Sequence, residues 1–287
     1  MAQELKHPIH SGFWKRVNNL EDRSFSAKLI RFSRSRIMAL TDTLYALADE
    51  PRTFQALLKG WDKDHFQRLI RWKDIGFEPE TIYDIGANKG EWSRMCRHLF
   101  PGANLHLFEP LSRFHESLKR LESGRTTFSG QTKLHPLALG DENGSAEIHV
   151  TENVAASSIL APKTETMTSR FGTKSNQTEV IQVRRLDDLA GEEQLPTPTL
   201  VKIDVQGFES EVFKGGRNTL AQAKAVIVEV SLAELYQGQP LLMDMIELLE
   251  SLEFSLDDLV ESCRSWPDGR LWQVDLWMTK RDEHTSL

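Results

Sequence analysis

Apolar residues follow two patterns along most of this chain, short runs of strand length and longer segments with apolar positions at helical spacing. From residue 82 onward the two patterns alternate regularly, which predicts βαβ units on a parallel sheet. The expected strands are 82–83, 105–108, 134–139, 200–205, 225–230, 254–260 and 271–278, with helices at about 92–99, 113–121, 209–221 and 241–252.

The regular alternation breaks between Ser145 and Asp188. Strand-like runs at 146–150 and 180–184 flank a polar segment, 163–178, that is rich in Thr and Ser. We expect an antiparallel excursion that carries a mobile loop. Such a loop is either a lid over a site or a disordered segment without function, and the sequence leaves both open.

The first seventy or so residues differ, because apolar residues recur at helical spacing among many Lys and Arg side chains. This pattern predicts a helical extension over residues 1–74, followed by a catalytic domain over 75–287. The basic face is either a docking surface, for an acidic partner, a second copy or anionic lipid, or simply a solvated helix face. A further helical pattern at 54–72 should pack on the sheet and could roof a ligand cleft.

The first candidate for chemistry is the segment 81–93, an apolar strand that ends in Asp84 and opens into a glycine turn. Gly86 and Gly90 allow positive φ and a close approach of the backbone to a ligand. A helix that starts near Glu91 would point free N–H groups at the same place, and the Asp84 carboxylate could accept from an ammonium. The combination suits a zwitterionic amino-acid ligand.

The glycine turn departs from the dinucleotide fingerprint, because Asn88 and Glu91 stand where the second and third glycines belong. A second strand, 104–108, ends in Glu109, about twenty residues past the turn. A carboxylate at this offset can grip a ribose diol. The sequence therefore predicts a ribose-containing ligand without a pyrophosphate and argues against a nicotinamide oxidoreductase.

Four motifs occur in one order: D-I-G-A-N-x-G from Asp84, F-E-P from Phe108, A-L-G-D from Ala138 and V-K-I-D-V-Q-G-F-E from Val201. With these motifs the chain closely resembles the FkbM-type S-adenosylmethionine-dependent methyltransferases over residues 75–280. The resemblance implies an α/β fold, a Rossmann-like class I methyltransferase sheet of seven strands with an antiparallel insertion.

The resemblance also implies roles for residues at matching positions. The methionine part of S-adenosylmethionine would contact Asp84, Gly86, Asn88 and Gly90, with Trp92 and Ser93 beside them. Glu109 and Pro110 would hold the ribose, and the segment from Leu139 to Asp141 would flank the adenine. A serine pair, Ser157 and Ser158, would face the acceptor or, alternatively, form an ordinary turn.

Acidic residues end several strands, and the carboxyl ends of parallel strands meet at one rim of the sheet, where ligands bind. These residues are Asp84, Glu109, Asp141, Asp204 and Glu229. A hydroxyl acceptor would benefit from a general base, for which Asp204 is the first candidate and Glu229 the second. The two could instead ligate a divalent cation such as Mg²⁺, which we rank below a metal-free reaction.

The composition narrows the class of acceptor. The net charge of −7 argues against nucleic acid as the main partner. Two cysteines, Cys96 and Cys263, and no signal-type or transmembrane-length apolar run favour a reduced, cytoplasmic protein. The resemblance, together with this composition, implies O-methylation of a small molecule or glycan, with S-adenosylhomocysteine as the product. The rival is a catalytically silent scaffold that recruits a partner, or a second copy, through its basic N-terminal helices.

Overall fold

The computed structural model describes residues 52–122, 129–171, 175–265 and 268–281. The chain divides into two compact units, residues 1–60 and 61–287. In the first unit the structure describes one helix, α3 (Thr53–Lys59), which ends at Gly60 in the left-handed conformation. The basic helices expected before it lie outside the described residues, so their roles in docking or oligomerisation stay predictions, as does a domain boundary at residue 74.

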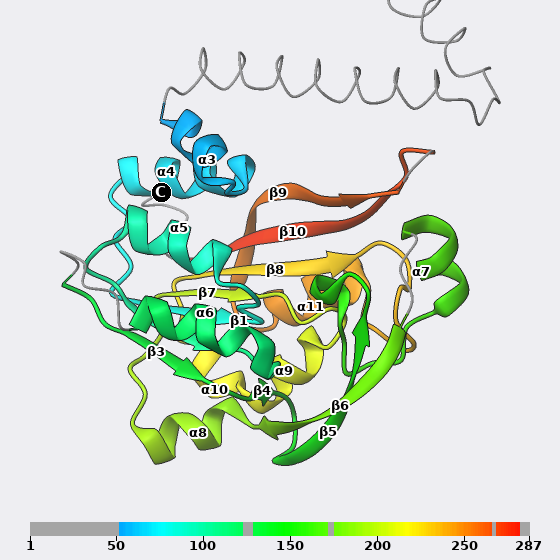
Figure 1. The fold of residues 1–287 in the computed structure, drawn as a ribbon. Helices are drawn as coiled ribbons and strands as arrows, with labels where there is room; N and C mark the ends of the chain where they lie inside the picture. Colours follow the sequence, from blue (N-terminus) through cyan, green and yellow to red (C-terminus); the bar gives the residue numbers. More distant parts are fainter. Residues whose placement is uncertain (1–51, 123–128, 172–174, 266–267, 282–287) are drawn as a thin grey trace, which may run out of the picture. The chain divides into compact units, whose positions relative to one another are not determined.

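The second unit contains a seven-stranded sheet in which the chain starts in the middle and moves outward twice (Figure 1). The first five strands run parallel, and the strand before the last edge runs antiparallel to both of its neighbours. The order across the sheet is β3 (Thr132–His135), β2 (Asn104–Phe108), β1 (Thr81–Ile85), β7 (Leu200–Ile203), β8 (Ala225–Ser231), β10 (Leu271–Lys280) and β9 (Phe254–Arg264). The predicted Rossmann-like sheet of seven strands is confirmed, and its direction switches between β1 and β7.

Helices cover both faces of this sheet (Figure 1). One face carries α4 (Lys63–Asp74), α5 (Glu91–Leu99) and α6 (Ser112–Glu122). The other carries α8 (Leu186–Glu193), α9 (Glu209–Gly215), α10 (Arg217–Leu220) and α11 (Leu242–Glu250). Side chains of β1, β7 and β8 pack with α8 to α11 in one continuous apolar core. Because the central strands are buried on both faces, a charged side chain within them needs a specific partner.

The helical pattern at 54–72 is two helices rather than one, because Gly60 adopts a φ of 68° and ends α3. The second helix, α4, begins at Asp62, whose side chain accepts a hydrogen bond from the His65 N–H at 2.8 Å. Its Trp72 ring packs edge-on against Trp277 of β10, with centroids 4.9 Å apart. The α4 helix is thereby fixed on the sheet, as the sequence predicted.

The antiparallel excursion is a separate sheet of three strands, in the order β4 (Ala138–Leu139), β6 (Ser175–Arg184) and β5 (Gly144–Thr151). A short 3₁₀ turn, η1 (Val154–Ala156), follows β5. The strand expected at 134–139 is corrected, since its two halves, β3 and β4, belong to different sheets on either side of Pro136.

The polar loop expected at 163–178 is also corrected. It contains the helix α7 (Thr164–Phe171) and the first residues of β6. Met167 of α7 is buried against Leu235, Tyr236 and Trp272, and this contact anchors a segment whose polar composition suggested a mobile loop. Helix α8 was not predicted, and the helix expected at 209–221 is divided at Gly216 into α9 and α10.

Candidate active site

Asp84 lies at the end of β1 and is buried. Its Oδ2 accepts a hydrogen bond from the Ser93 hydroxyl of α5, and Lys202 lies opposite it in the register of β7. Burial raises the pKa of Asp84, and the Lys202 charge and the Ser93 hydrogen bond partly oppose that rise. Among the described residues, Asp84 Oδ1 has no hydrogen-bond partner. An orphaned carboxylate oxygen at this point fits the ammonium group of an amino-acid ligand.

The glycine turn after β1 adopts the expected positive φ, 85° at Gly86 and 77° at Gly90, with Asn88 at 50°. The close approach is to the protein itself, however. A Cβ on Gly86 would lie 2.0 Å from the Asp204 carbonyl oxygen, and one on Gly90 would meet the Leu118 side chain at 2.7 Å. Gly86 and Asn88 line the cavities described below, whereas Gly90 lines neither and serves the packing of α5 against α6.

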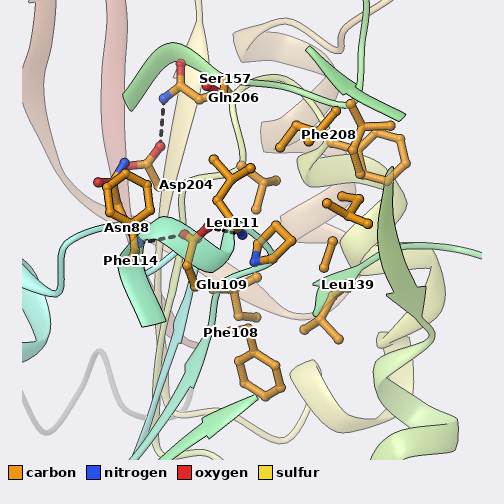
Figure 2. Close-up of a pocket in the computed structure, with 18 of the residues that line it drawn as sticks. Asn88, Phe108, Glu109, Leu111, Phe114, Leu139, Ser157, Asp204, Gln206 and Phe208 are labelled. Atoms are coloured by element: carbon orange, nitrogen blue, oxygen red, sulfur yellow. Dashed lines mark hydrogen bonds between the residues drawn. The ribbon is translucent and has the colours of Figure 1, made fainter. Parts of the chain in front are cut away.

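Glu109 follows β2 and is buried, with both carboxylate oxygens held by backbone groups (Figure 2). The N–H of Asn88 donates to Oε2 and the N–H of Leu111 donates to Oε1, each at 2.8 Å. Burial raises the pKa of Glu109 to about 7, against the effect of these two hydrogen bonds. The carboxylate is therefore fixed in orientation beside the glycine turn and titrates close to neutrality.

An apolar cavity adjoins Glu109, and the second sheet forms its far wall (Figure 2). Phe108 and Leu139 line this cavity, and so does Phe208 from the loop before α9. The apolar side chains that line the cavity are Ile85, Phe108, Pro110, Leu111, Phe114, Leu137, Ala138, Leu139, Ile148, Val154, Ala155, Ile159, Ile181, Val205 and Phe208. A flat aromatic ring is the kind of ligand that such a cavity binds, with Glu109 at its edge for a diol.

A second, polar cavity of about 360 Å³ lies on the other side of the glycine turn. The two cavities share lining residues, so they are adjacent; these are Gly86, Asn88, Ala155, Asp204 and Gln206. Trp92 of α5 lines the polar cavity, and so do Asp84 and Glu229. A ligand that extends from one cavity into the other would pass Asp204.

Asp204 and Glu229 are joined through one side chain, that of Gln206. Its Nε2 donates to Asp204 Oδ1 at 2.8 Å and to Glu229 Oε2 at 2.6 Å. Gln206 itself has a left-handed φ of 56°, which is uncommon for a residue other than glycine. Glu229 also accepts from Gln273 Nε2 at 2.7 Å and Ser262 Oγ at 2.6 Å. The two predicted base candidates thus form one hydrogen-bonded unit.

The two carboxyl groups differ in charge state. Burial alone would raise the pKa of Asp204, but the Lys202 ammonium and the hydrogen bonds from Lys202 and Gln206 outweigh burial and lower it. Burial raises the pKa of Glu229 well above its usual range, and the charges of Asp204 and Asp275 raise it further. Asp204 is therefore the more acidic member of the pair, and Glu229 holds its proton to a higher pH.

Two residues that the sequence did not indicate complete the polar cavity. Asp275 of β10 lies opposite Glu229 in the antiparallel register, and its Oδ2 is 2.9 Å from His65 Nε2 of α4. Both residues line the cavity. Asp275 stands in the middle of an apolar run, between Val274 and Leu276, and this interruption is the signal that could have revealed it. Nothing in the pattern of α4 singles out His65.

The remaining predicted residues fall into three groups. Pro110, Leu139 and Ser157 line the apolar cavity. Ser93 and Ser158 are buried and act through other groups, Ser93 through Asp84, and Ser158 through a hydrogen bond of 2.6 Å to the Gln206 carbonyl. Asp141 is exposed and lines neither cavity, because β4 belongs to the second sheet and does not end at the rim.

The described residues contain neither a metal centre nor a membrane span. No group of three His, Cys, Asp or Glu side chains among them is arranged to hold a metal ion. None of the helices in the described part of the chain is long and apolar enough to cross a membrane.

Comparisons with known proteins agree with the geometry. Residues 84–256 match the family model described as the methyltransferase FkbM domain. The chain is 33% identical over 187 residues to the 2-O-methyltransferase NoeI of Sinorhizobium fredii, covering 60% of this chain and 72% of that protein. It is 29% identical over 153 residues to the hexuronic acid methyltransferase AglP of Haloferax volcanii, covering 53% of this chain and 56% of that protein.

One similar solved structure is the magnesium protoporphyrin IX methyltransferase ChlM of Synechocystis with bound SAM, at 12% identity and a TM-score of 0.43, covering 94% of this chain and 92% of that chain. The family model and the two relatives define the chain as a methyltransferase. More particularly, the match over most of the catalytic domain means that this chain belongs to the FkbM methyltransferase family and is an O-methyltransferase.

Proposed function

We propose that this chain transfers the methyl group of S-adenosylmethionine to a hydroxyl of a sugar, free or within a larger glycan or small molecule. The observation that carries this proposal is the position of Asp204 at the junction of the two cavities, hydrogen-bonded through Gln206 to Glu229. The names of two relatives, a 2-O-methyltransferase and a hexuronic acid methyltransferase, support a sugar as the acceptor.

The residues present fit the cofactor. We assign the adenine to the apolar cavity beside Leu139, and the ribose diol to the Glu109 carboxylate, whose two oxygens are already oriented by backbone donors. The orphaned Oδ1 of Asp84 is the acceptor we assign to the ammonium of the methionine part. S-adenosylmethionine, when bound, supplies a methyl group on a positively charged sulfur, which is the electrophile.

The chain's own contribution is to position the acceptor and to take up a proton. Asp204 is ionised, so it accepts a hydrogen bond from the acceptor hydroxyl and then its proton as the new bond forms. Lys202 fixes the orientation of the Asp204 carboxylate from the side of the strand. Glu229 lines the same cavity and binds a proton more readily than Asp204, so we assign it to orienting the acceptor rather than to taking up its proton.

We favour a reaction that needs no divalent cation. Lys202 lies close enough to Asp84, Asp204 and Asp275 for each of their charges to raise its pKa. Its ammonium group thus supplies positive charge at the place where Mg²⁺ would sit among these carboxylates. The proposal therefore predicts that removal of divalent cations leaves turnover unchanged.

Calorimetry and a transfer assay test the proposal together. S-adenosylmethionine and S-adenosylhomocysteine should bind in the micromolar range, with and without EDTA, and NAD should not bind. The bound enzyme should then methylate at least one hydroxyl in a panel of methyl glycosides. Cofactor binding without transfer to any sugar hydroxyl would contradict the acceptor class, and loss of activity in EDTA would contradict the metal-free reaction.

A further inference from the structure

The polar cavity is strongly acidic for a site that would hold a sugar. The acids that line it come from β1, β8, β10, the loop after β7 and the starts of α4 and α5. They are Asp62, Asp84, Glu91, Asp204, Glu229 and Asp275. Its basic side chains are Lys89, Lys202 and His65, and the lining contains no arginine within the described residues.

The positive charges in this cavity are not free to bind an anion. Lys202 is buried and forms an ion pair of 2.7 Å with Asp204. Lys89 is exposed to solvent at the mouth of the cavity. An ammonium group that is already paired gains little from a second carboxylate. The exposed Lys89 is screened by solvent to the same degree as the exposed Asp62 and Glu91, so it offsets only one of these two acids.

The acidic side chains of the cavity still outnumber the basic ones after burial has favoured protonation of Glu229 and after the cofactor has bound. Burial favours the neutral form of Glu229, whereas the Lys202 charge opposes the same effect at Asp84, so Asp62, Asp84, Glu91, Asp204 and Asp275 stand against Lys89, Lys202 and His65. S-adenosylmethionine brings two positive groups and one carboxylate, so it offsets only part of this excess. A carboxylate on the acceptor would therefore enter a cavity with net negative charge and would be repelled.

The same lining suits a neutral sugar. Carboxylates accept hydrogen bonds from hydroxyl donors, and a sugar presents several such donors. Trp61 and Trp92, both half-buried, add two large indole rings to the walls of the cavity. An aromatic ring packs well against the apolar C–H face of a pyranose.

We propose that the acceptor is a neutral, hydroxyl-rich sugar, and that the acids of the polar cavity exclude sugars that carry a carboxylate. This inference rests on the proposed function and chooses between the neutral and acidic sugars that it leaves open. Asp62 and Glu91 repel acidic sugars at the mouth of the cavity. Asp204 and Asp275 repel them in its interior.

A matched set of acceptors tests the inference. Methyl β-D-glucopyranoside and methyl β-D-glucopyranosiduronate share a ring and their secondary hydroxyls but differ in charge at C6. The methyl ester of the glucuronide removes the charge and keeps the size. Transfer of a CD3 group from labelled S-adenosylmethionine is followed by mass spectrometry, and binding to the S-adenosylhomocysteine complex by saturation-transfer NMR.

We expect kcat/KM to be at least about tenfold higher for the glucoside and for the ester than for the glucuronide at low salt. The gap should narrow as ionic strength rises. The double variant Asp62→Asn, Glu91→Gln removes two charges and keeps an Asn cap on α4, so it should also narrow the gap.

The outcomes separate this inference from the proposed function. A glucuronide that is bound and methylated as well as the glucoside overturns the exclusion of acidic sugars and leaves sugar O-methylation standing. A preference for the glucoside that persists unchanged in the ester, in high salt and in the double variant overturns the electrostatic cause. If none of the three sugars binds or is methylated, both the inference and the proposed sugar acceptor fail.

Discussion

The Nζ of Lys202 lies 2.7 Å from the Oδ2 of Asp204, two residues further along the chain, and both groups line the polar cavity. Lys202 is the charged residue of β7 and is buried one residue before the strand ends at Ile203, so its side chain reaches the cavity from within the sheet. The ion pair lowers the pKa of Asp204, whereas burial and the Asp204 charge raise the pKa of Glu229, which is joined to Asp204 through Gln206. One carboxyl group is thereby ready to accept a proton.

Replacing Asp204 by Asn should remove that acceptor and keep the shape of the side chain. We expect turnover to fall by about 10²- to 10⁴-fold, the contribution typical of a general base. The matched control is Asp141→Asn, which alters an exposed acid outside both cavities and should leave turnover within about twofold. Steady-state kinetics measure the turnover of both variants, and calorimetry measures their cofactor affinity. Near-normal turnover in Asp204→Asn would mean that another group acts as the general base.

The pKa of Glu109, about 7, makes cofactor binding depend on pH. A ribose diol donates hydrogen bonds, and these favour the ionised carboxylate. S-adenosylmethionine affinity should therefore rise as the pH increases through 7 and fall below it. In Glu109→Gln the affinity at pH 8 should weaken by about 1–3 kcal/mol, and most of the pH dependence should disappear.

Glu209 provides a matched control for Glu109. Its pKa is also raised to about 7 by burial, and it accepts hydrogen bonds from backbone N–H groups, but it lines neither cavity. Calorimetric titrations between pH 6 and 8.5 should show the wild-type pH dependence in Glu209→Gln. An equal loss of that dependence in both variants would mean that it reflects the fold rather than contact with the ribose.

Gly86→Ala should be costly because its Cβ would lie 2.0 Å from the Asp204 carbonyl oxygen, in a backbone with positive φ. Gly76→Ala separates the two effects, since Gly76 has a φ of 95° and a Cβ added there would have no atom within 4 Å. We expect Gly76→Ala to lower the free energy of unfolding by about 1–2 kcal/mol, from backbone strain alone. Thermal unfolding should show a distinctly larger loss for Gly86→Ala, with cofactor binding abolished; equal losses would mean that the turn relaxes freely.

The buried pair His106 and His135 should make stability depend on pH. The two rings are joined by a contact of 3.0 Å between Nδ1 and Nε2, and burial lowers both pKa values to about 4. In the unfolded chain, histidines bind protons near pH 6.5. Between pH 6.5 and 4 the unfolded state therefore binds more protons, and the free energy of unfolding should fall as the pH drops through this window.

The measurement is the melting temperature between pH 4 and 7.5 for the wild type and for His135→Gln. The variant should flatten the acid side of the curve. His149→Gln, on β5 of the second sheet, is the control and should keep the wild-type slope. A wild-type curve that is flat over this range would contradict the buried, neutral state of the pair.

Much of the site could be read from the sequence because strand-end acids are conspicuous. Asp84, Glu109, Asp204 and Glu229 each follow an apolar run that is buried on both faces, and the parallel strands bring them to one rim. Asp141 has the same local pattern but lines neither cavity, because β4 belongs to the second sheet, and nothing local in the sequence shows this.

The rest of the site depends on tertiary structure. Asp275 reaches the rim from mid-strand, because β10 runs antiparallel and places it opposite Glu229. His65 comes from a helix that precedes the sheet, and only the packing of α4 brings it to Asp275. The helix α7 was missed for a similar reason, since a single buried side chain, Met167, anchors a polar segment.

Transfer of a methyl group to a sugar hydroxyl is the activity that the paired cavities and Asp204 are proposed to carry out. The measurement is incubation of the wild-type enzyme with CD3-labelled S-adenosylmethionine and methyl β-D-glucopyranoside, followed by mass spectrometry and NMR of the sugar. We expect a labelled methyl ether on a ring hydroxyl, formed together with S-adenosylhomocysteine. An enzyme that binds the cofactor yet leaves the glucoside and every other glycoside of the panel unlabelled, or labels a site other than a hydroxyl, would contradict the proposed activity.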